Sequence, residues 1–185
     1  MPEVKMPTEA PAVDLRYPIG KLERKSALSP DDRRIAIEHI AQTPGLLSAA
    51  VAALTPEQLD TPYRDGGWTV RQLVHHIADS HMNAFIRFKL ALTEQEPTIK
   101  PYDQAAWAEL ADSKAPVEVS LALLAALHQR WVPLLRGMKP EDFARTVRHP
   151  EMGIVTLDGS LGIYSWHGRH HVAHVTSLRA RKGWN

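Results

Sequence analysis

Residues 68–88 read WTVRQLVHHIADSHMNAFIRF, and this stretch decides the fold class. Thr69, followed three residues later by Gln72, is the pattern of a capping box, in which each side chain accepts from the other residue's backbone N–H group. Apolar residues then recur at the 3.6-residue spacing of a helix with one buried face. They are Val70, Leu73, Val74, Ile77, Ala84, Phe85 and Phe88. The stretch therefore predicts a long amphipathic helix that continues to about Thr93.

Three further long helices are predicted on either side of this one. The first runs from an N-cap at Ser29 toward Leu54, and Pro44 predicts a kink or break within it. The other two start near Pro116 and Gly159. Four long helical segments without alternating strands predict an all-α fold, a four-helix bundle.

The pattern changes between the last two of these helices. Residues 145–148 and 154–157 have the composition of short strands and flank Pro150 and Gly153, which predicts a small β-hairpin. Residues 1–28 carry four prolines and little periodicity. We therefore expect an irregular arm over residues 1–28, followed by one helical domain over residues 29–185.

The composition excludes several classes of function. The 185-residue chain has no cysteine, so disulfides, cysteine-ligated zinc and a protein thiol nucleophile are excluded. Its formal net charge of +1 disfavours general binding to nucleic acid or to an anionic membrane. The longest apolar run, Leu121–Leu127, is too short to span a bilayer, and no secretory signal is visible. We expect a cytoplasmic protein.

Histidine is the residue type that points to chemistry. Seven of the ten histidines fall in two windows, residues 75–81 and 167–174. In the later window, His167 and His171 are four residues apart, and so are His170 and His174. Side chains at this spacing share one helical face, where two imidazoles can bind one metal ion. The spacing alone does not choose between the two pairs.

The earlier window offers a third ligand from another helix. On a helical wheel centred on Ile77, His81 lies about 40° away, His76 about 100° and His75 about 160°. His75 is therefore expected to face solvent, and His76 to reach a neighbouring helix from the flank. His81 lies within the apolar stripe, where a buried, hydrogen-bonded histidine of the core is the alternative to a ligand. His76 and His81 are not expected to bind the same ion.

Other interpretations of these histidines stay open. A single His-x3-His pair also occurs on helix surfaces without any metal, and His39, His128 and His149 are expected to be structural or solvated. The zincin arrangement is disfavoured, since no glutamate stands within the pair, and no phosphate-binding or GxSxG motif occurs. Two clusters on different helices favour a metal site between them.

The same residues resemble a known family. WTVRQ at 68–72, the two histidines that follow it and ADSHMN at 78–83 are similar to the second helix of the YfiT branch of the DinB-like superfamily. The resemblance continues in YPIG at 17–20, YRDGG at 63–67 and WHGRHHVAH at 166–174. It covers roughly Leu15 to Trp184.

The resemblance implies a DinB-like four-helix bundle that binds one divalent metal ion per chain, zinc or nickel. Its three ligands correspond here to His76, His167 and His171, so that the resemblance selects the first of the two pairs. It assigns no role to His75, His81, His170 or His174. Members of the family are often homodimers.

The resemblance also implies a choice of activities. Three neutral imidazoles leave the charge of the ion uncompensated, so that bound water approaches a pKa of about 7 and a bound thiol ionises. Some relatives are metal-dependent hydrolases. Others join a low-molecular-weight thiol, such as bacillithiol, mycothiol or glutathione, to an electrophilic small molecule. We expect the S-transferase, with the hydrolase and a non-catalytic metal-binding stress or interaction module as alternatives.

Four residues near the predicted ligands are expected to support them or to contact a small-molecule substrate. Helical spacing brings them close to the metal site. They are Asp79, Ser80, Asn83 and Tyr164.

Overall fold

The computed structural model describes residues 14–184, and four long helices account for most of them. These helices are α1 (Pro30–Val51), α3 (Val70–Thr93), α5 (Val117–Gly137) and α6 (Leu157–Lys182). The connections contain two short α-helices, α2 (Pro56–Leu59) and α4 (Gln104–Ala108), and two single-turn 3₁₀ helices, η1 (Ala111–Lys114) and η2 (Pro140–Ala144). Two strands complete the described part of the chain, β1 (Thr146–His149) and β2 (Gly153–Thr156).

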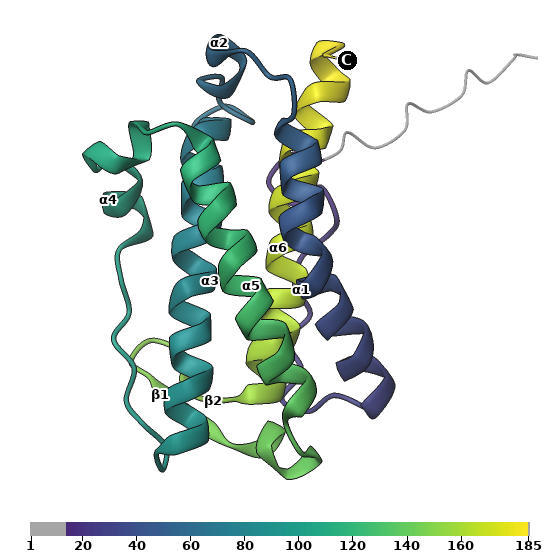
Figure 1. Ribbon diagram of the computed structural model, residues 1–185, viewed down its shortest axis with the longest axis vertical. Helices are drawn as coiled ribbons and strands as arrows, with labels where there is room; N and C mark the ends of the chain where they lie inside the picture. The colour runs from purple at the N-terminus through teal and green to yellow at the C-terminus, as the bar shows by residue number, and fades with distance from the viewer. Residues whose placement is uncertain (1–13, 185) are drawn as a thin grey trace, which may run out of the picture.

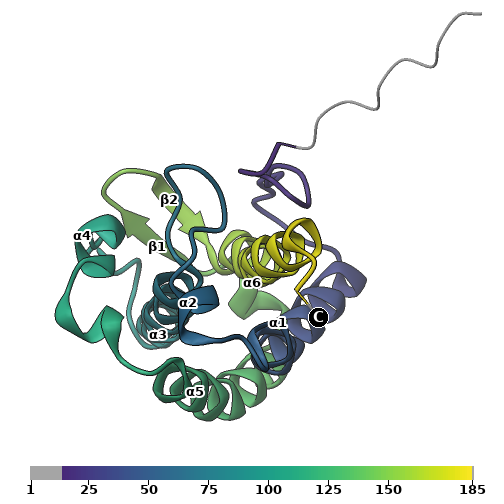
Figure 2. The same ribbon diagram turned by 90° about the horizontal axis from the view of Figure 1, so that it is seen from above.

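The four long helices form one bundle, as predicted. Around its axis the order is α1, α5, α3 and α6, and each helix packs against two neighbours (Figure 2). Helices α1 and α6 run in one direction, while α3 and α5 run in the other (Figure 1). The chain therefore crosses the bundle diagonally from α1 to α3 and again from α5 to α6. This topology places α3 beside α6, although 63 residues separate the end of one from the start of the other.

Local signals start α1 and α3 where the sequence predicts, and a glycine ends α6. The Ser29 hydroxyl accepts from the backbone N–H of Asp32 at the start of α1. Thr69 and Gln72 form the predicted capping box of α3. Gly183 ends α6 in the left-handed conformation, with φ of 65°, which glycine adopts without steric cost.

The predicted break at Pro44 does not occur, since α1 continues through it to Val51. Proline has no N–H group, so the carbonyl of Ile40 lacks its usual donor from four residues ahead. A side chain of the neighbouring helix α5 replaces that donor: Nδ1 of His128 lies 2.8 Å from the Ile40 oxygen. Tertiary packing thus satisfies the group that the proline leaves without a partner.

The hairpin between α5 and α6 is confirmed. Strands β1 and β2 pair in antiparallel register, with Thr146 opposite Thr156 and His149 opposite Gly153. The segment after α3 adds a parallel bridge from Thr98 to β1. The hairpin therefore links the C-terminal end of α3 to the N-terminal end of α6.

The predicted arm lies partly outside the described residues, which begin at residue 14. Residues 14–28 form turns and irregular backbone, without a helix or strand. This segment is attached to the bundle through Asp158, which accepts from the backbone N–H of Leu28 and forms an ion pair with Arg33. The Trp166 indole N–H also donates to the Gly20 carbonyl at 3.2 Å.

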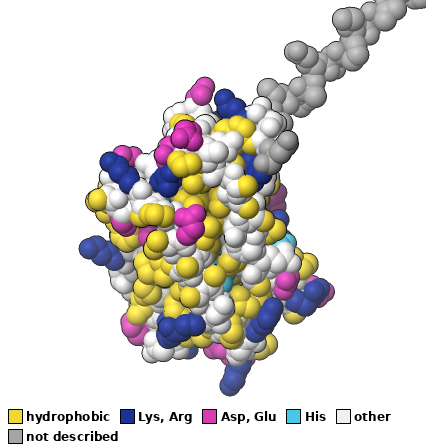
Figure 3. Space-filling model, turned by 45° about the horizontal axis from the view of Figure 1, so that its top comes forward, with side chains coloured by type: hydrophobic (Ala, Val, Ile, Leu, Met, Phe, Trp, Pro, Cys, Tyr) yellow, Lys and Arg dark blue, Asp and Glu magenta, His cyan; other side chains and the backbone are white. Residues whose placement is uncertain are grey.

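The bundle interior is apolar at both ends. One cluster surrounds Phe88, Trp131 and Leu161, and the other surrounds Leu47 and Leu73. On the face seen in Figure 3, lysine and arginine are interspersed with aspartate and glutamate, and little histidine is visible. Among the described residues, no helix is long and apolar enough to cross a membrane.

Helices α1 and α6 are in close contact where Gly168 faces Thr43. A Cβ atom at residue 168 would lie 2.5 Å from Thr43 Oγ1 and 2.8 Å from its Cγ2. Thr43 is buried, and its hydroxyl donates to the His39 carbonyl, so that it cannot easily move aside. The absence of a side chain at residue 168 therefore sets the spacing of the two helices, one position after His167.

We expect Gly168→Ala to lower the free energy of unfolding by about 1–3 kcal/mol, because the added methyl group overpacks the contact. Gly162→Ala on the same helix is the matched control, since a Cβ there meets no atom within 4 Å. It should be neutral or stabilising by up to about 1 kcal/mol, because alanine favours helices over glycine. Urea unfolding measures both, and Thr43→Ala should restore part of the stability of Gly168→Ala. Equal effects of the two glycine substitutions would contradict the steric explanation.

Candidate metal centre

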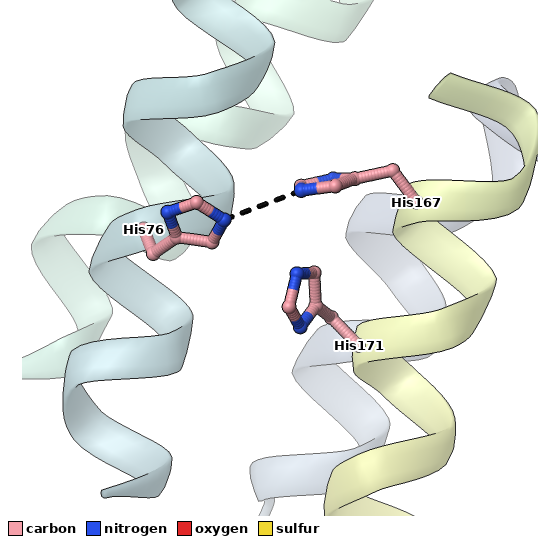
Figure 4. Close-up of side chains that lie close together, drawn as sticks. All are labelled: His76, His167 and His171. Carbon is pink, nitrogen blue, oxygen red and sulfur yellow. Dashed lines mark hydrogen bonds between the residues drawn. The ribbon is translucent and has the colours of Figure 1, made fainter. Parts of the chain in front are cut away.

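Three histidines from two helices converge on one space between α3 and α6 (Figure 4). His76 projects from α3, while His167 and His171 project from successive turns of α6. Nε2 of His76 lies 3.2 Å from Nε2 of His167. Each of the three rings offers a nitrogen, and these atoms all lie within 4.8 Å of one another. The pairing of α3 with α6 therefore assembles a group that could hold a metal ion.

The electrostatics of the three rings suit a cation. Burial lowers the pKa of His76 to about 4, and it lowers the pKa values of His167 and His171 well below 6.5. All three imidazoles are therefore neutral near pH 7, which is the form that binds metals. Two nitrogens at about 2.1 Å from a tetrahedral ion lie about 3.4 Å apart. The 3.2 Å separation of the His76 and His167 nitrogens fits this arrangement.

A cavity of about 340 Å³ opens beside these three rings. Its other walls come from the loop before α3, from the start of α4 and from α6. The residues that line it besides the three histidines are Tyr63, Arg64, Gly66, Gly67, Trp68, Gln104, Trp166 and His170. None of these is an aspartate or glutamate. A small molecule in this cavity would meet aromatic walls, one arginine and the three imidazoles.

Aromatic side chains hold several of the histidine rings in place. Trp68 lies against His76, with ring centroids 4.6 Å apart. Trp166 stacks on His170 at 4.0 Å, and Tyr63 stacks on His174 at 4.1 Å. Ring stacking of this kind contributes about 0.5–1.5 kcal/mol beyond the buried area. The tryptophans and Tyr63 thus belong to the walls of the site.

The second pair of α6 histidines lies beside the first. His170, His171 and His174 also bring one nitrogen each within 4.8 Å of one another. Nδ1 of His174 lies 3.4 Å from Nδ1 of His171. In the described part of the chain, Nδ1 of His170 and Nε2 of His174 are buried without a hydrogen-bond partner. The two predicted pairs therefore form one continuous imidazole cluster.

His75 does not face solvent, and the prediction for it was wrong. It is buried, with Nδ1 at 2.7 Å from the Ser120 hydroxyl and Nε2 at 3.1 Å from the Ala115 carbonyl. The helical wheel assumed one buried face, but α3 packs against α5, α6, α4 and η1. The residues around Ala115 cover the side of α3 that would otherwise be exposed.

His81 is the buried, hydrogen-bonded core histidine that the sequence offered as an alternative. Its side chain is fully buried, and its two nitrogens face two other histidines. Nε2 lies 3.3 Å from Nδ1 of His167, and Nδ1 lies 2.9 Å from Nε2 of His128. His128 was expected to be structural or solvated; it is buried, and no sequence pattern connects it to the site, because it lies on a third helix, α5.

The four residues predicted to support the site fall into two groups. Ser80 and Tyr164 are buried, and the Tyr164 ring lies 5.8 Å from His167 and 5.5 Å from His81. Asn83 donates to the Asp79 carbonyl of its own helix, and burial with nearby Asp112 raises the pKa of Asp79 to about 6. Among the described residues, no hydrogen bond joins Asp79 or Asn83 to the three histidines of the centre.

Several cavity residues were given no role by the sequence analysis. Tyr63 and Arg64 lie in a motif that was quoted only for its resemblance to a family, and Trp68 directly precedes the predicted helix cap at Thr69. The Arg64 side chain donates to the Asp65 carbonyl, and its Nε is buried without a partner in the part of the chain that the structure describes. Gln104 carries no signal in the sequence, since the start of α4 reaches the cavity only through the long connection from α3.

Comparisons with known proteins agree with this class of site, a helical bundle with a histidine centre that could bind metal. The family model described as the DinB superfamily matches residues 39–175. A Bacillus cereus protein named "Putative metal-dependent hydrolase" is 56% identical over 171 residues, which cover 92% of this chain and 99% of that protein. A Bacillus anthracis protein of the same name is 55% identical over the same length. The chain belongs to the DinB superfamily.

A solved structure supports the same family and the same topology. It is described as "YfiT from Bacillus subtilis is a probable metal-dependent hydrolase with an unusual four-helix bundle topology". The sequence identity is 52%, the TM-score is 0.90, and the match covers 94% of this chain and 100% of that one. The fold and the family expected from the sequence are thus confirmed.

The buried histidines predict how the stability of the metal-free protein depends on pH. The pKa values of His76, His128, His170 and His174 are lowered to about 4, mainly by burial. Between pH 6.5 and about 4 the unfolded chain therefore binds more protons than the folded one. The free energy of unfolding should be constant above pH 7 and should fall below pH 6.5, on the order of 1 kcal/mol per histidine per pH unit.

Urea unfolding at pH 7.5, 6.5 and 5.5, with a chelator present, measures this effect. Asp79 acts in the opposite sense, because its raised pKa stabilises the fold as the pH falls below 6, but it is one group against several histidines. An unfolding free energy that stays constant from pH 7.5 to 5.5 would contradict the assignment of neutral buried imidazoles.

Proposed function

We propose that this chain is a metal-dependent enzyme, in which His76, His167 and His171 hold one divalent ion, zinc or nickel, that activates a nucleophile. The most specific form of the proposal is an S-transferase that joins a low-molecular-weight thiol to an electrophilic small molecule. The observation that carries it is the set of three neutral imidazoles, with His76 and His171 buried and His167 half-buried, at the wall of a cavity without a lining carboxylate. When bound there, a divalent ion supplies Lewis-acid chemistry and favours the ionised form of a thiol or water.

The cavity supports an anionic substrate. The three ligands carry no charge, and no aspartate or glutamate lines the cavity to offset the charge of an ion. Arg64 adds a further positive charge, and its buried Nε has no partner among the described residues. The Arg64 guanidinium at the cavity wall suits a carboxylate, which glutathione and bacillithiol carry. Arg64 would then bind and orient the thiol substrate.

The remaining cavity residues would position the electrophile and exclude water. Trp68 and Trp166 give the cavity flat apolar walls, and each lies against a histidine of the cluster. The Gln104 side chain offers one donor and one acceptor group at the cavity wall. Aromatic walls with polar groups between them suit a small organic substrate.

A hydrolase is the second candidate, and the names of the Bacillus relatives favour it. In that case water, and not a thiol, would be the nucleophile. The absence of a lining carboxylate means that no glutamate base of the zincin type serves this cavity. The two candidates therefore share one metal centre and differ in the nucleophile that the cavity admits.

Metal content tests the centre itself. Protein purified without a His-tag should contain about one zinc or nickel ion per chain, and His171→Ala and His76→Ala should lose it, because two ligands no longer hold the ion tightly. Elemental analysis measures the content, and His149→Ala is the control, since His149 lies in the hairpin. If the wild-type chain neither contains nor takes up a divalent ion, the proposed centre is wrong.

Two assays separate the candidate activities. An S-transferase should consume a thiol such as glutathione or bacillithiol together with a model electrophile, and should lose this activity with a chelator or with His76→Ala. Arg64→Gln should raise KM for the thiol about 10-fold or more, because it removes the charge that would bind a carboxylate. Release of product from an activated ester without any thiol would instead support the hydrolase. Metal binding with neither activity would identify a non-catalytic module.

A further inference from the structure

A line of hydrogen bonds leads from the metal centre through the core to the backbone of α1. It starts at Nδ1 of His167, 3.3 Å from Nε2 of His81. Nδ1 of His81 lies 2.9 Å from Nε2 of His128, and Nδ1 of His128 lies 2.8 Å from the Ile40 carbonyl. The line therefore uses both nitrogens of His81 and His128 and crosses α6, α3 and α5 before it ends on α1.

The Ile40 carbonyl, at the end of the line, determines which nitrogen of each ring carries the proton. A carbonyl oxygen can only accept, so Nδ1 of His128 must be the protonated nitrogen. Its Nε2 then has a lone pair and accepts from Nδ1–H of His81. By the same step, Nε2 of His81 accepts from Nδ1–H of His167. Each neutral ring has one proton, and consequently Nε2 of His167 carries a lone pair.

Pro44 makes the Ile40 carbonyl available for this role. In an uninterrupted helix, the carbonyl of residue 40 would accept from the N–H group of residue 44. Proline has no such group, and the oxygen of Ile40 faces α5 within the buried core. Pro44, where a kink or break was expected, thus leaves free the acceptor at which the line ends.

The surroundings of the line hold its rings and exclude competing partners. His81 is fully buried and His128 nearly so. Their rings stack with an interplanar angle of 16°, and Trp131 contacts both edge-on, with centroids 5.6 Å away. Desolvation keeps both imidazoles neutral. No carboxylate hydrogen-bonds to these rings in the described structure, so the backbone carbonyl is the terminal acceptor.

We propose that His81 and His128 are positioning residues of the metal centre, which hold His167 in the tautomer that directs its Nε2 lone pair at the ion. The expected effect on metal affinity rests on the proposed metal centre. The tautomers themselves can be observed without metal. A ligating histidine commonly donates its other N–H group to a carboxylate, carbonyl or water, and loss of that partner lowers metal affinity 10- to 100-fold. Here two further histidines stand between the ligand and the carbonyl.

Two substitutions at residue 128 separate positioning from stability. In His128→Gln, the side-chain oxygen can still accept from Nδ1–H of His81, whereas His128→Leu offers no acceptor. Both leave the Ile40 carbonyl without its donor, and His128→Leu also leaves Nδ1–H of His81 unpaired, so the stability of each variant is measured beside its metal affinity. We expect His128→Leu to weaken zinc or cobalt binding 10- to 100-fold, and His128→Gln to stay within a few-fold of wild type. His149→Leu, another buried histidine, is the control and should bind metal as wild type does.

Metal affinity is measured by competition with a chromogenic chelator, and urea unfolding of each variant reports its stability. Equal affinities of wild type and His128→Leu would overturn the proposal. So would an equal loss of affinity in His128→Gln and His128→Leu, because the effect would then follow stability and not the acceptor.

The tautomers are tested on the metal-free wild-type protein. Nitrogen NMR of 15N-labelled histidine distinguishes protonated from unprotonated ring nitrogens, and we expect Nδ1–H for His167, His81 and His128. Nε2–H on His167 would overturn the proposal. If wild type binds no metal while the three Nδ1–H tautomers are present, the proposed function fails and the hydrogen-bond line stands. The two failures are therefore distinguishable.

Discussion

Burial of imidazole rings between α3 and α6 is the constraint on which the site depends. A buried polar ring is costly unless it is neutral and hydrogen-bonded or bound to metal. The rings meet this requirement by stacking on tryptophan and tyrosine, by bonding one another and by losing their charge. The absence of a side chain at Gly168 lets α1 pack tightly behind α6, which keeps the α6 histidines directed at α3.

The topology of the bundle explains how such a site arises from distant segments. The chain crosses the bundle diagonally twice, so that α3 and α6 become neighbours while α1 and α5 close the other side. His76 and His167 are 91 residues apart in sequence, and their Nε2 atoms lie 3.2 Å apart. The same crossing places His128 of α5 between His81 and the α1 backbone. All four helices therefore contribute to one hydrogen-bonded assembly.

The chemistry of the centre follows from neutral ligands and from a cavity without lining acids. An ion held by three uncharged rings keeps its full charge available for a substrate. The cavity beside the rings adds Arg64 and aromatic walls. Relatives of this chain in Bacillus carry the name "Putative metal-dependent hydrolase", and an ion bound here would activate water or a thiol by the same Lewis-acid effect. Whether water or a thiol is the nucleophile therefore depends on which of them the cavity binds.

The sequence by itself determined the four helices, their caps, the hairpin and the two histidine clusters. These features depend on local patterns, namely 3.6-residue periodicity, Ser29 and Thr69 as N-caps, and i to i+4 histidine spacing. The family resemblance rested on the same motifs. It implied that His76, His167 and His171 are the three metal ligands.

Only the tertiary structure decided the burial of His75, the continuity of α1 through Pro44 and the role of His128. Each depends on which helix packs against which, and no local pattern encodes that choice. His75 is covered because α3 has neighbours on several sides, and α1 stays intact because α5 supplies a donor to Ile40. A hydrogen bond between helices needs both partners in place, so its existence follows from the packing of the whole bundle.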